Sequence, residues 1–533
     1  MPERRLLILG AGFGGVFAAK RLRRRLPGDV AIEIVDDNNY FVFQPLLPEV
    51  AGGSVNVADA VVPLRSLLPG VTIREATILG IDLVERRVEV QQGMRGTLHV
   101  LACDHLVIAL GQTVDLRRYP GLGEHALRMK DLADAFRLRN HVIDCLEQAD
   151  IAADPELKRR LLTFVVVGGG LSGVETVGEI HDMIARALTF YPRINRRSVR
   201  MLLVEYQPRI LPEVADGLAE YAARRLSRRG IEVITGVGVK SASRDAIELT
   251  DGRVVDAMTV VATVGNGPSP LVESLPVDRR RGRIVADRHL RVPGYEGVWT
   301  LGDAAWVPAG RDDEAATPPT AQAAVQQAEV LAANIQAATG GGALAAFEYR
   351  RKGQLASLGG RRGVADVYGF ELSGFFAWVM WRLFYLVMLP GFATKVRVAV
   401  DWMLDALFPR NLVQIQQPSP QAVRKQRFRA GDVVYERGEV AGPLYLVVEG
   451  RLRRTSPGEE EAVLETGSLF GDGALRGERL RRATVTALEN SYCLALERAD
   501  LELLAGHLER LGLCLAGSGL GEPASEAQRG RPG

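Results

Sequence analysis

The chain has 533 residues, enough for two to four domains, and 47% of them are hydrophobic, which supplies large cores. Its 66 lysines and arginines nearly balance its 64 aspartates and glutamates, so no nucleic-acid partner is expected. The seven histidines show no metal-ligand spacing, and we expect no metal site. The cysteines are scattered rather than paired, which excludes a disulfide framework and suits a reducing cytoplasm. They are Cys103, Cys145, Cys493 and Cys514.

The N-terminal stretch predicts a strand, a tight turn and a helix. A buried strand over residues 4–9 leads into glycines at G-x-G-x-x-G spacing, a turn that seats a pyrophosphate on the backbone N–H groups of a helix start. A second predicted strand, residues 31–35, ends in Asp36, where a carboxylate can accept the hydroxyl groups of an adenosine ribose. Asp37 is the alternative, and a surface-loop role for these acids stays open. The glycines of the turn are Gly10, Gly12, Gly14 and Gly15.

The segment 38–53 (NNYFVFQPLLPEVAGG) mixes aromatic and small residues around Gln44. It either wraps a flat ring system or forms a simple buried loop. Residues 71–110 then alternate in short strands, and the last strand, residues 105–110, stops at Gly111.

A second strand–turn–helix follows, with glycines at the same spacing. After a predicted inserted loop, residues 188–198, its second strand ends in Glu205, which is placed to contact a second adenosine ribose. A carboxylate there repels a 2′-phosphate, so NADH is favoured over NADPH. One such turn is a weak signal, but two predict a protein that holds two dinucleotides. The glycines of the second turn are Gly168, Gly170 and Gly173.

Three further pieces carry polar groups or glycines at the ends of predicted elements. A buried strand stops at Gly265. Another ends in Gly302 and Asp303, where a carboxylate and neighbouring N–H groups can hold a ribityl chain and a flavin. Gln322 and Gln326, four residues apart, share one face of a predicted helix, although a plain polar-faced helix is an open alternative.

The combined order of these motifs resembles a known family. It runs GAGFGG, Asp36, NNYFVFQPLLPEVA, ALG, VVGGGLSGVE, Glu205, GDAA and PPTAQAAVQQA. Over residues 4 to about 413 the chain resembles the type II NADH dehydrogenases, the non-proton-pumping NADH:quinone oxidoreductases, which are flavoproteins with two dinucleotide-binding domains. The QPLL segment and the AQ-x-A-x-QQ run are more specific to that family than the glycines.

The resemblance implies an α/β fold with two Rossmann-like dinucleotide-binding domains for FAD and NADH, a helical membrane-attachment region and a C-terminal β-roll. The implied FAD-binding residues are Gly10, Gly12, Gly14, Gly15, Asp36, Gln44, Gly111, Gly302, Asp303 and Ala321. The implied NADH-binding residues are Gly168, Gly170, Gly173, Glu205 and Gly265. The implied catalytic residues are Glu175, Gln322 and Gln326. The alternative for Glu175 is an acid that complements the dipole of its helix.

The implied activity is hydride transfer from NADH to FAD, followed by transfer of two electrons to a membrane quinone. Most relatives of this fold use a cysteine pair for the second step, and this chain has none in place, so a diffusing two-electron acceptor such as quinone fits better. An enzyme with another acceptor, sulfide or a small iron–sulfur protein, is a less favoured alternative, since a sulfide-oxidising relative would need paired cysteines. A rival interpretation is a nucleotide-responsive redox sensor with little turnover.

Residues 372–392 are aromatic-rich, and Arg382 breaks an otherwise nearly uncharged stretch of about the length that a spanning helix needs. The next run predicts an amphipathic helix, since its apolar residues share one face: Phe392, Val396, Val400, Met403 and Leu407. The resemblance favours an interfacial anchor with tryptophans at headgroup depth, namely Trp378, Trp381 and Trp402. A core helix pair in a dimer and a spanning helix are the alternatives. We expect peripheral attachment through residues 372–408 to the cytoplasmic face of the cell membrane, and a homodimer.

The C-terminal part resembles a cyclic-nucleotide-binding β-roll. The run FGDGAL, followed by RRATV, matches the phosphate-binding cassette of that family in order and spacing. Arg481 falls at the position that pairs with the cyclic phosphate, and Asp472 replaces a ribose-binding glutamate. A cyclic-nucleotide effector and a purely structural or partner-binding role both stay open. The candidate residues are Gly471, Asp472, Arg481, Arg482 and Thr484.

The expected domain plan is built from these segments. It comprises a flavoprotein module at 1–342 with an NADH subdomain at about 160–265, a membrane-attachment region at 343–413, a linker at 414–422, a β-roll at 423–514 and a disordered tail at 515–533.

Overall fold

The computed structural model of the chain describes residues 4–93, 96–309, 316–414, 423–439, 442–458, 461–472 and 480–496. The chain forms two compact units, one of residues 1–88 and 101–416 and the other of residues 89–100 and 417–533. Residues 415–422 of the predicted linker, and the predicted tail, lie outside the described residues.

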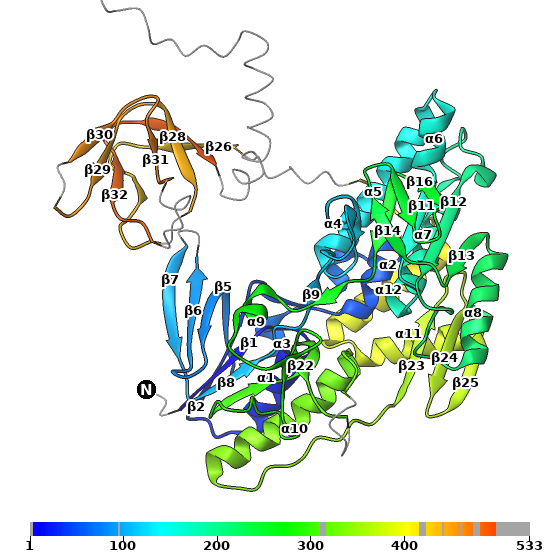
Figure 1. Cartoon of the computed structure of the whole chain (residues 1–533), viewed down its shortest axis with the longest axis horizontal. Coiled ribbons are helices and arrows are strands. Elements are labelled where there is room, and N and C mark those ends of the chain that lie inside the picture. The colour runs from blue at the N-terminus through cyan, green and yellow to red at the C-terminus, as the bar shows by residue number, and fades with distance from the viewer. Residues whose placement is uncertain are drawn as a thin grey trace, which may run out of the picture. The chain divides into compact units, whose positions relative to one another are not determined.

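Two parallel sheets form the centre of the first unit (Figure 1). One has the order β21-β8-β1-β2-β5; the other has the order β10-β17-β11-β12-β13. The first comprises β1 (Arg4–Leu9), β2 (Val30–Asp36), β5 (Thr72–Asp82), β8 (His105–Ile108) and β21 (Val298–Thr300). Strands β6 (Arg87–Gln92) and β7 (Thr97–Ala102) consist mostly of residues 89–100, which belong to the second unit. The second comprises β10 (Leu127–Arg128), β11 (Thr163–Val167), β12 (Arg200–Glu205), β13 (Ile231–Thr235) and β17 (Thr259–Ala262). The expectation of two α/β halves is confirmed.

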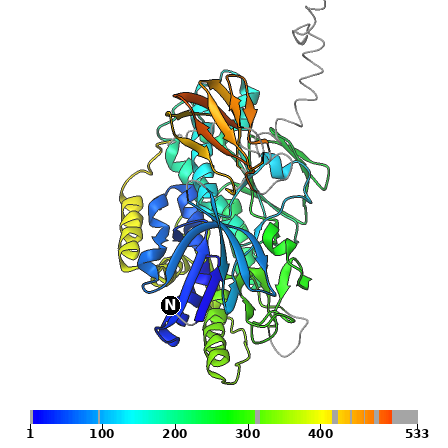
Figure 2. The same cartoon turned by 90° about the vertical axis from the view of Figure 1, so that its left-hand side faces the viewer.

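Helices connect successive parallel strands in both sheets, as is usual in α/β folds. The apolar face of α1 (Phe13–Arg25) is buried at Val16, Ala19 and Leu22. Both views show α1 lying beside α10 (Ala321–Gly340) (Figure 1, Figure 2). The other long helices of this part are α5 (Leu132–Ile151), α7 (Leu171–Ala187) and α8 (Asp216–Arg228). Shorter elements are β4 (Val61–Pro63), α3 (Leu64–Leu67), β9 (Thr113–Val114), α4 (Leu122–His125), α6 (Pro155–Leu161), β14 (Val239–Ala242), β15 (Ala246–Leu249), β16 (Val254–Asp256), β18 (Asn266–Gly267), α9 (Pro270–Ser274), β19 (Arg279–Arg280), β20 (Arg283–Val285) and β22 (Ala305–Trp306).

Each of the two glycine turns requires a close backbone approach. A side chain on Gly15 would overlap the carbonyl oxygen of Gly10, and one on Gly173 would overlap that of Gly168. Only glycine therefore lets α1 and α7 start so close to the preceding strand.

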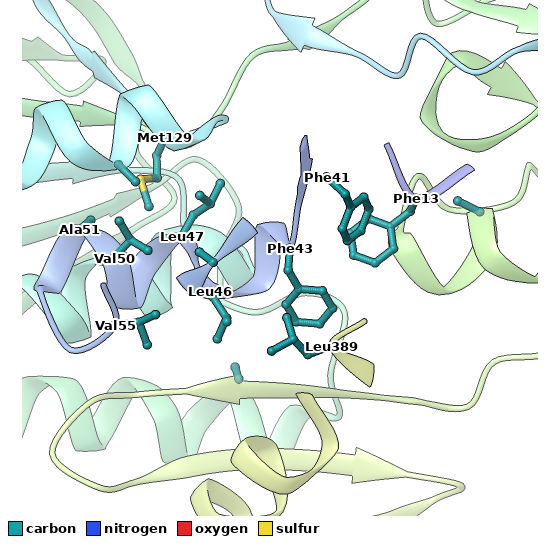
Figure 3. Close-up of a cluster of buried hydrophobic side chains, with 14 of the residues drawn as sticks. Phe13, Phe41, Phe43, Leu46, Leu47, Val50, Ala51, Val55, Met129 and Leu389 are labelled. Carbon is teal, nitrogen blue, oxygen red and sulfur yellow. The ribbon is translucent and has the colours of Figure 1, made fainter. Parts of the chain in front are cut away.

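The segment 38–53, predicted as a loop, is largely regular, so that interpretation is wrong. It contains β3 (Tyr40–Val42), a 3-10 turn and α2 (Leu47–Gly52). A proline in the first turn of α2 and a left-handed glycine after its end bound this short helix. Phe41 and Phe43 are fully buried, and their rings lie 5.0 and 5.7 Å from that of Phe13 (Figure 3). Leu389 completes this packing from the C-terminal part of the unit (Figure 3).

The C-terminal part of the first unit is a three-stranded antiparallel sheet followed by two helices. These elements are β23 (Gly353–Ser357), β24 (Gly363–Val367), β25 (Phe370–Gly374), α11 (Phe375–Met388) and α12 (Phe392–Leu407). Among the described residues, no helix is both long enough and apolar enough to cross a membrane. The spanning alternative for residues 372–392 is therefore wrong: β25 occupies the start of that stretch, and α11 ends at Met388.

The two faces of the α11–α12 pair differ. The predicted apolar stripe of α12 is 41–83% exposed, which confirms that its five residues share one outward face. Trp381 and Trp402, by contrast, are only 1% and 7% exposed, so their predicted position at headgroup depth is wrong. A buried indole needs an acceptor for its N–H, and both rings find one inside the protein.

The second unit contains a β-roll of two four-stranded sheets, with the orders β26-β33-β28-β31 and β27-β32-β29-β30. Its core includes Tyr435, Tyr445, Val447, Phe470 and Cys493. The strands are β26 (Val423–Phe428), β27 (Val433–Tyr435), β28 (Leu444–Glu449), β29 (Leu452–Thr455), β30 (Ala462–Leu464), β31 (Leu469–Phe470), β32 (Thr484–Ala487) and β33 (Ser491–Leu496). The predicted β-roll is confirmed.

The contact between α2 and α7 depends on Gly52, because a methyl group there would lie 2.8 Å from Cβ of Glu179 and 2.9 Å from its carbonyl oxygen. We expect Gly52→Ala to lower the free energy of unfolding by about 2 kcal/mol, since the two helices would have to separate. Urea denaturation measures this change.

The matched control is Gly340→Ala. Like Gly52, Gly340 is the last residue of a helix and precedes a left-handed glycine, but apart from its chain neighbours and the nearby backbone of its own helix, no atom of the described residues lies within 4 Å of the added methyl. This variant should be neutral or slightly stabilising. Equal stability of the two variants would contradict the close contact.

Candidate functional site

The first glycine turn leaves the start of α1 without a side-chain cap. Its N-cap residue is Gly12, and no acid occupies the first helical turn. Asp36, at the end of β2, accepts a hydrogen bond from the N–H of Ala11 at 2.6 Å. Burial raises the pKa of Asp36, and the backbone N–H groups that it accepts from oppose that rise. Asp36 therefore bonds the backbone just ahead of α1, and the first turn of α1 itself begins without a side-chain cap.

The Gly302–Asp303 turn adjoins this first turn. Gly302 approaches both Gly14 and the first turn of α10, which begins at Ala321. The N–H of Gly302 donates to Oε1 of Gln327 at 2.7 Å, so a buried glutamine fixes the turn. Burial raises the pKa of Asp303. These groups converge from the first glycine turn, β21 and α10.

Two predicted FAD residues remain, Gly111 and Gln44. Gly111 follows β8, the neighbour of β1, and so lies at the same edge of the sheet as Gly10. Gln44 is exposed at the start of the 3-10 turn before α2.

The second glycine turn repeats the arrangement of the first. Gly170 precedes α7 and provides no side-chain cap, and no acid occupies the first helical turn. Glu205, at the end of β12, accepts hydrogen bonds from the N–H groups of Gly169 and Gln207. Gly265 follows β17, the strand on the other side of β11, and packs against the backbone of Asp115.

Both turns fit a dinucleotide. The long helices α5 and α10 begin with side-chain caps from Asp131 and Thr320, whereas α1 and α7 begin with glycines that leave their N–H groups for another acceptor. A pyrophosphate is such an acceptor, and a carboxylate at the end of the next strand suits a ribose. Among the described residues, no group of histidine, cysteine and acidic side chains could hold a metal ion.

Glu175 lies in α7, but its side chain points toward the C-terminal region. Its Oε1 accepts hydrogen bonds from Nε1 of Trp381 at 2.7 Å and from the N–H of Ser357 at 3.0 Å. Burial raises the pKa of Glu175 to about 8. The Trp381 ring lies 4.8 Å from that of Tyr385, which in turn lies 6.0 Å from Phe43.

Two more carboxyl groups are buried next to Glu175. Glu49, in α2, accepts from Nε1 of Trp402 at 2.9 Å, and Glu179, one turn after Glu175 in α7, accepts from the Ser54 hydroxyl at 3.2 Å. We call Glu49, Glu175 and Glu179 the carboxyl cluster; they are 2–6% exposed. Burial raises the pKa of Glu49 and of Glu179; the charge of Glu179 raises the pKa of Glu49 further, and the charges of Glu49 and Glu179 raise that of Glu175.

Two arginines balance the cluster from α11 and from the segment after α12. Arg410 is 3.0 Å from Glu179, and Arg382 is 3.6 Å from Glu49. Arg382 also stacks over the rings of Trp378 and Trp402, at 4.3 and 4.7 Å. The positive charge of Arg382, which would be costly in a membrane-spanning helix, therefore points into the protein and is paired with Glu49.

Gln322 and Gln326 hold one stretch of backbone. Gln322 accepts from the Tyr349 hydroxyl at 3.0 Å and from the N–H of Lys352 at 3.2 Å. Gln326 donates to the carbonyl of Arg350 and accepts from its N–H, at 2.9 and 3.1 Å. Both amides fix the segment that leads from α10 into β23.

In the β-roll, Arg481 is buried and its guanidinium is engaged. It donates to the carbonyl oxygens of Gly471 at 2.9 Å and Pro443 at 2.8 Å, and lies 4.1 Å from the Tyr435 ring. Its predicted role as a phosphate partner would require it to exchange these carbonyls for the ligand.

The other predicted nucleotide residues of the β-roll lie around Arg481. Asp472 and Arg482 are exposed, and the Thr484 hydroxyl accepts from the N–H of Arg437 at 3.1 Å. Residues 473–479 of the predicted cassette lie outside the described residues.

Comparison with known proteins identifies the family. Residues 4–328 match the pyridine nucleotide-disulphide oxidoreductase family, residues 351–411 the NDH2 C-terminal domain, and residues 425–506 the cyclic nucleotide-binding domain. The chain is 32% identical over 426 residues to the type II NADH:quinone oxidoreductase of Mycobacterium tuberculosis, which covers 77% of this chain and 89% of that protein. This chain belongs to the type II NADH:quinone oxidoreductases.

A second type II enzyme is similar in sequence, and two solved structures share the fold. The Staphylococcus epidermidis type II NADH:quinone oxidoreductase is 31% identical over 379 residues, which covers 70% of this chain and 92% of that protein. NDH2 from Plasmodium falciparum, solved in complex with NADH, shares the fold with a TM-score of 0.71 at 19% identity, over 77% of this chain and 100% of that chain. The sulfide:quinone oxidoreductase of Aquifex aeolicus gives a TM-score of 0.59 at 19% identity, over 76% and 94%.

Sequence reasoning did not single out Glu49, Glu179 or Gln327 as site residues. Glu179 carried a signal, since it lies four residues after Glu175 on the same helix face. Glu49 lies in an apolar run, LLPEV, where a lone acid calls for a buried partner. Its partner Trp402 is 353 residues away, and no local pattern joins them.

The raised pKa of Glu175 predicts a pH dependence of stability. The ordinary value is 4.5 and the folded value is about 8, so folding takes up a proton between these limits. Stability should therefore fall by up to about 1.4 kcal/mol per pH unit from about pH 4.5 to about pH 8, and then level off. Glu175→Gln has no proton to release, and its unfolding midpoint should fall less over this range.

The control for this prediction is Glu156→Gln, which removes an exposed acid of α6 and should keep the wild-type pH dependence. An unchanged slope in Glu175→Gln would show that this carboxyl is ionised when folded.

Proposed function

We propose that this type II NADH:quinone oxidoreductase oxidises NADH with a bound FAD and reduces a membrane quinone without pumping protons. The observation that supports this proposal most directly occurs twice in the chain. A helix begins without a side-chain cap, and the strand that follows it ends in a carboxylate. Flavin and NADH use and the quinone acceptor are the common properties of the family to which the chain belongs.

We assign the first turn to FAD, with the following residues: Gly10, Gly12, Gly14, Gly15, Asp36, Gln44, Gly111, Gly302, Asp303 and Ala321. We assign the second turn to NADH, with Gly168, Gly170, Gly173, Glu205 and Gly265. When bound, the flavin accepts a hydride and passes two electrons to the quinone. The expected domain boundaries remain our proposal, with the β-roll starting at residue 423.

The chain's own residues would position these groups. Gln322 and Gln326 hold the backbone of residues 349–352 beside α10. They would thereby shape the side of the Gly302–Asp303 turn at which we expect the quinone to accept electrons. Glu175, with its pKa raised to about 8, is placed to keep a proton close to the aromatic rings that adjoin the first turn.

We propose that the outward face of the α11–α12 pair attaches the enzyme peripherally to the cytoplasmic face of the cell membrane. Besides the α12 stripe, α11 exposes Phe376 at 77% and Val387 at 73%. An apolar surface of this kind favours burial at a bilayer interface, where the quinone is dissolved. A homodimer and regulation of turnover by a cyclic nucleotide at the β-roll remain part of this proposal, with Arg481 as the phosphate partner.

The enzyme assignment is tested with the purified full-length protein. It should contain FAD and oxidise NADH with a soluble short-chain quinone. The catalytic efficiency with NADPH should be at least about tenfold lower than with NADH, because Glu205 repels the 2′-phosphate of NADPH. The variant Glu205→Gln should reduce this difference in efficiency. Negligible quinone-dependent turnover despite bound FAD would refute the enzyme assignment, and equal efficiency with both donors would refute the role of Glu205.

The membrane surface is tested by placing charges on it. The double variant Phe392→Glu/Leu407→Glu alters side chains that are 83% and 69% exposed, and it should bind anionic lipid vesicles at least about tenfold more weakly. The control Val84→Glu/Ile151→Glu alters side chains that are 70% and 74% exposed elsewhere on the first unit, and it should sediment with vesicles like the wild type. Equal binding by both double variants would place the attachment elsewhere.

A further inference from the structure

On the proposed function, the bound flavin accepts a hydride from NADH. A hydride consists of two electrons and one proton, so a neutral flavin ring gains one negative charge when it accepts one. A buried negative charge is costly unless a positive charge stands near it. If the proposed function holds, the protein is therefore expected to place a cation beside the flavin ring.

Arg283 is a buried cation of the first unit. It is the first residue of β20, and only 7% of it is exposed. Its guanidinium donates to the carbonyl oxygens of Ala305 at 3.4 Å and Thr317 at 3.0 Å, and it lies 4.7 Å from the centre of the Trp306 ring. Carbonyl oxygens and the face of an indole attract a cation without carrying a full negative charge. These contacts therefore fix the position of Arg283 and leave its charge in place.

Among the residues that the structure describes, Arg283 has no ion-pair partner. Burial lowers its pKa, the charge of Asp303 raises it, and the charge of Arg281 lowers it further. A buried guanidinium usually has a carboxylate at contact distance. The charge of Arg283 is therefore available to a bound group.

Positive charge outweighs negative charge around Asp303. Burial raises the pKa of this carboxyl, and the charges of Lys130 and Arg283 both lower it. Arg281 stands on the same side, 5.8 Å from the centre of the Trp306 ring. Three cations thus act near one carboxylate, so the field at this place favours a further negative charge.

The guanidinium of Arg283 joins two pieces of chain that we assign to FAD. β20 pairs with β22 in parallel and contacts the Gly302–Asp303 turn that precedes β22. The carbonyl of Thr317, which Arg283 also holds, belongs to the segment just before α10, whose first residue is Ala321. The positive charge therefore lies behind both the turn and the helix start.

Trp306 carries a second donor beside this charge. Its side chain is buried, and its indole N–H has no hydrogen-bond partner among the described residues. A buried indole N–H usually finds an acceptor. A ligand with carbonyl oxygens would supply one, and the pyrimidine ring of a flavin carries two.

We propose that Arg283 is the counter-charge of the reduced flavin. Its guanidinium, held by the carbonyls of Ala305 and Thr317 and stacked on Trp306, offsets the negative charge that the ring gains with the hydride. A charge that is already fixed in place needs no rearrangement when the flavin is reduced. Arg283 thereby raises the midpoint potential of the flavin and favours hydride transfer from NADH, whereas the pyrophosphate rests on the N–H groups at the start of α1.

The test is a redox titration of the full-length protein, followed by the visible absorbance of its FAD. Arg283→Gln removes the charge and keeps an amide that can donate to a carbonyl. It should weaken the binding of reduced FAD relative to oxidised FAD about tenfold, which lowers the two-electron midpoint potential by about 30 mV. Arg283→Lys keeps the charge and should stay close to the wild-type potential.

The matched control is Arg139→Gln. Arg139, in α5, is 8% exposed and donates to the carbonyl oxygens of Asn411 and Val413, and burial lowers its pKa without a contribution from Asp303. Its loss removes a buried guanidinium of the same kind and should leave the midpoint potential unchanged. Arg283→Met, a second neutral variant that keeps an apolar stem, should show the same shift as Arg283→Gln.

An unchanged potential in both neutral variants of Arg283, or an equal shift in Arg139→Gln, would overturn the counter-charge. Equal weakening of oxidised and reduced FAD binding would place the guanidinium at the pyrophosphate and would overturn it as well. A wild-type protein without bound FAD would instead refute the proposed function. Normal quinone turnover with an unshifted potential in the Arg283 variants would refute the counter-charge alone.

Discussion

Three carboxyl groups that are only 2–6% exposed impose a physical constraint on the first unit. Burying an acid is costly unless it keeps its proton or gains partners, and here both remedies are present. Glu175 and Glu49 each receive an indole N–H, from Trp381 and Trp402, and arginines stand beside Glu49 and Glu179. All these partners come from α11, α12 and the segment just after them, so the C-terminal helices complete the flavoprotein core as well as forming an outward apolar face.

The dinucleotide-binding halves use one device twice. In each, the N–H of the residue after the first glycine of the turn donates to a carboxylate at the end of the neighbouring strand, Asp36 in one and Glu205 in the other. The strand carboxylate thus braces the turn as well as offering acceptors to a ribose. The halves differ in the packing of the helix after the turn: α1 packs on α10, whereas α7 carries Glu175 and Glu179 under the C-terminal helices.

Features with a local physical cause could be predicted from the sequence. Apolar runs ending at glycine indicated the parallel strands, and the spacing of Asp36 and Glu205 after the glycines placed both acids at strand ends, where the structure has them. The inward direction of Trp381 could not be predicted, because α11 is apolar around its circumference except at Arg382, so its periodicity selects no face. The helix within residues 38–53 could not be predicted either, because its six residues are too few to show a helical periodicity.

The ion pair between Glu179 and Arg410 has a consequence for the order in which the protein is made. Its two partners are separated by 231 residues, and Trp402 and Glu49 by still more. A ribosome that has synthesised both dinucleotide-binding halves has not yet produced the groups that accommodate their buried acids. Until residue 410 has emerged, the surface of α7 that carries the acids therefore stays open to water. The final packing of the first unit comes late in folding, because it depends on contacts between residues far apart in the sequence.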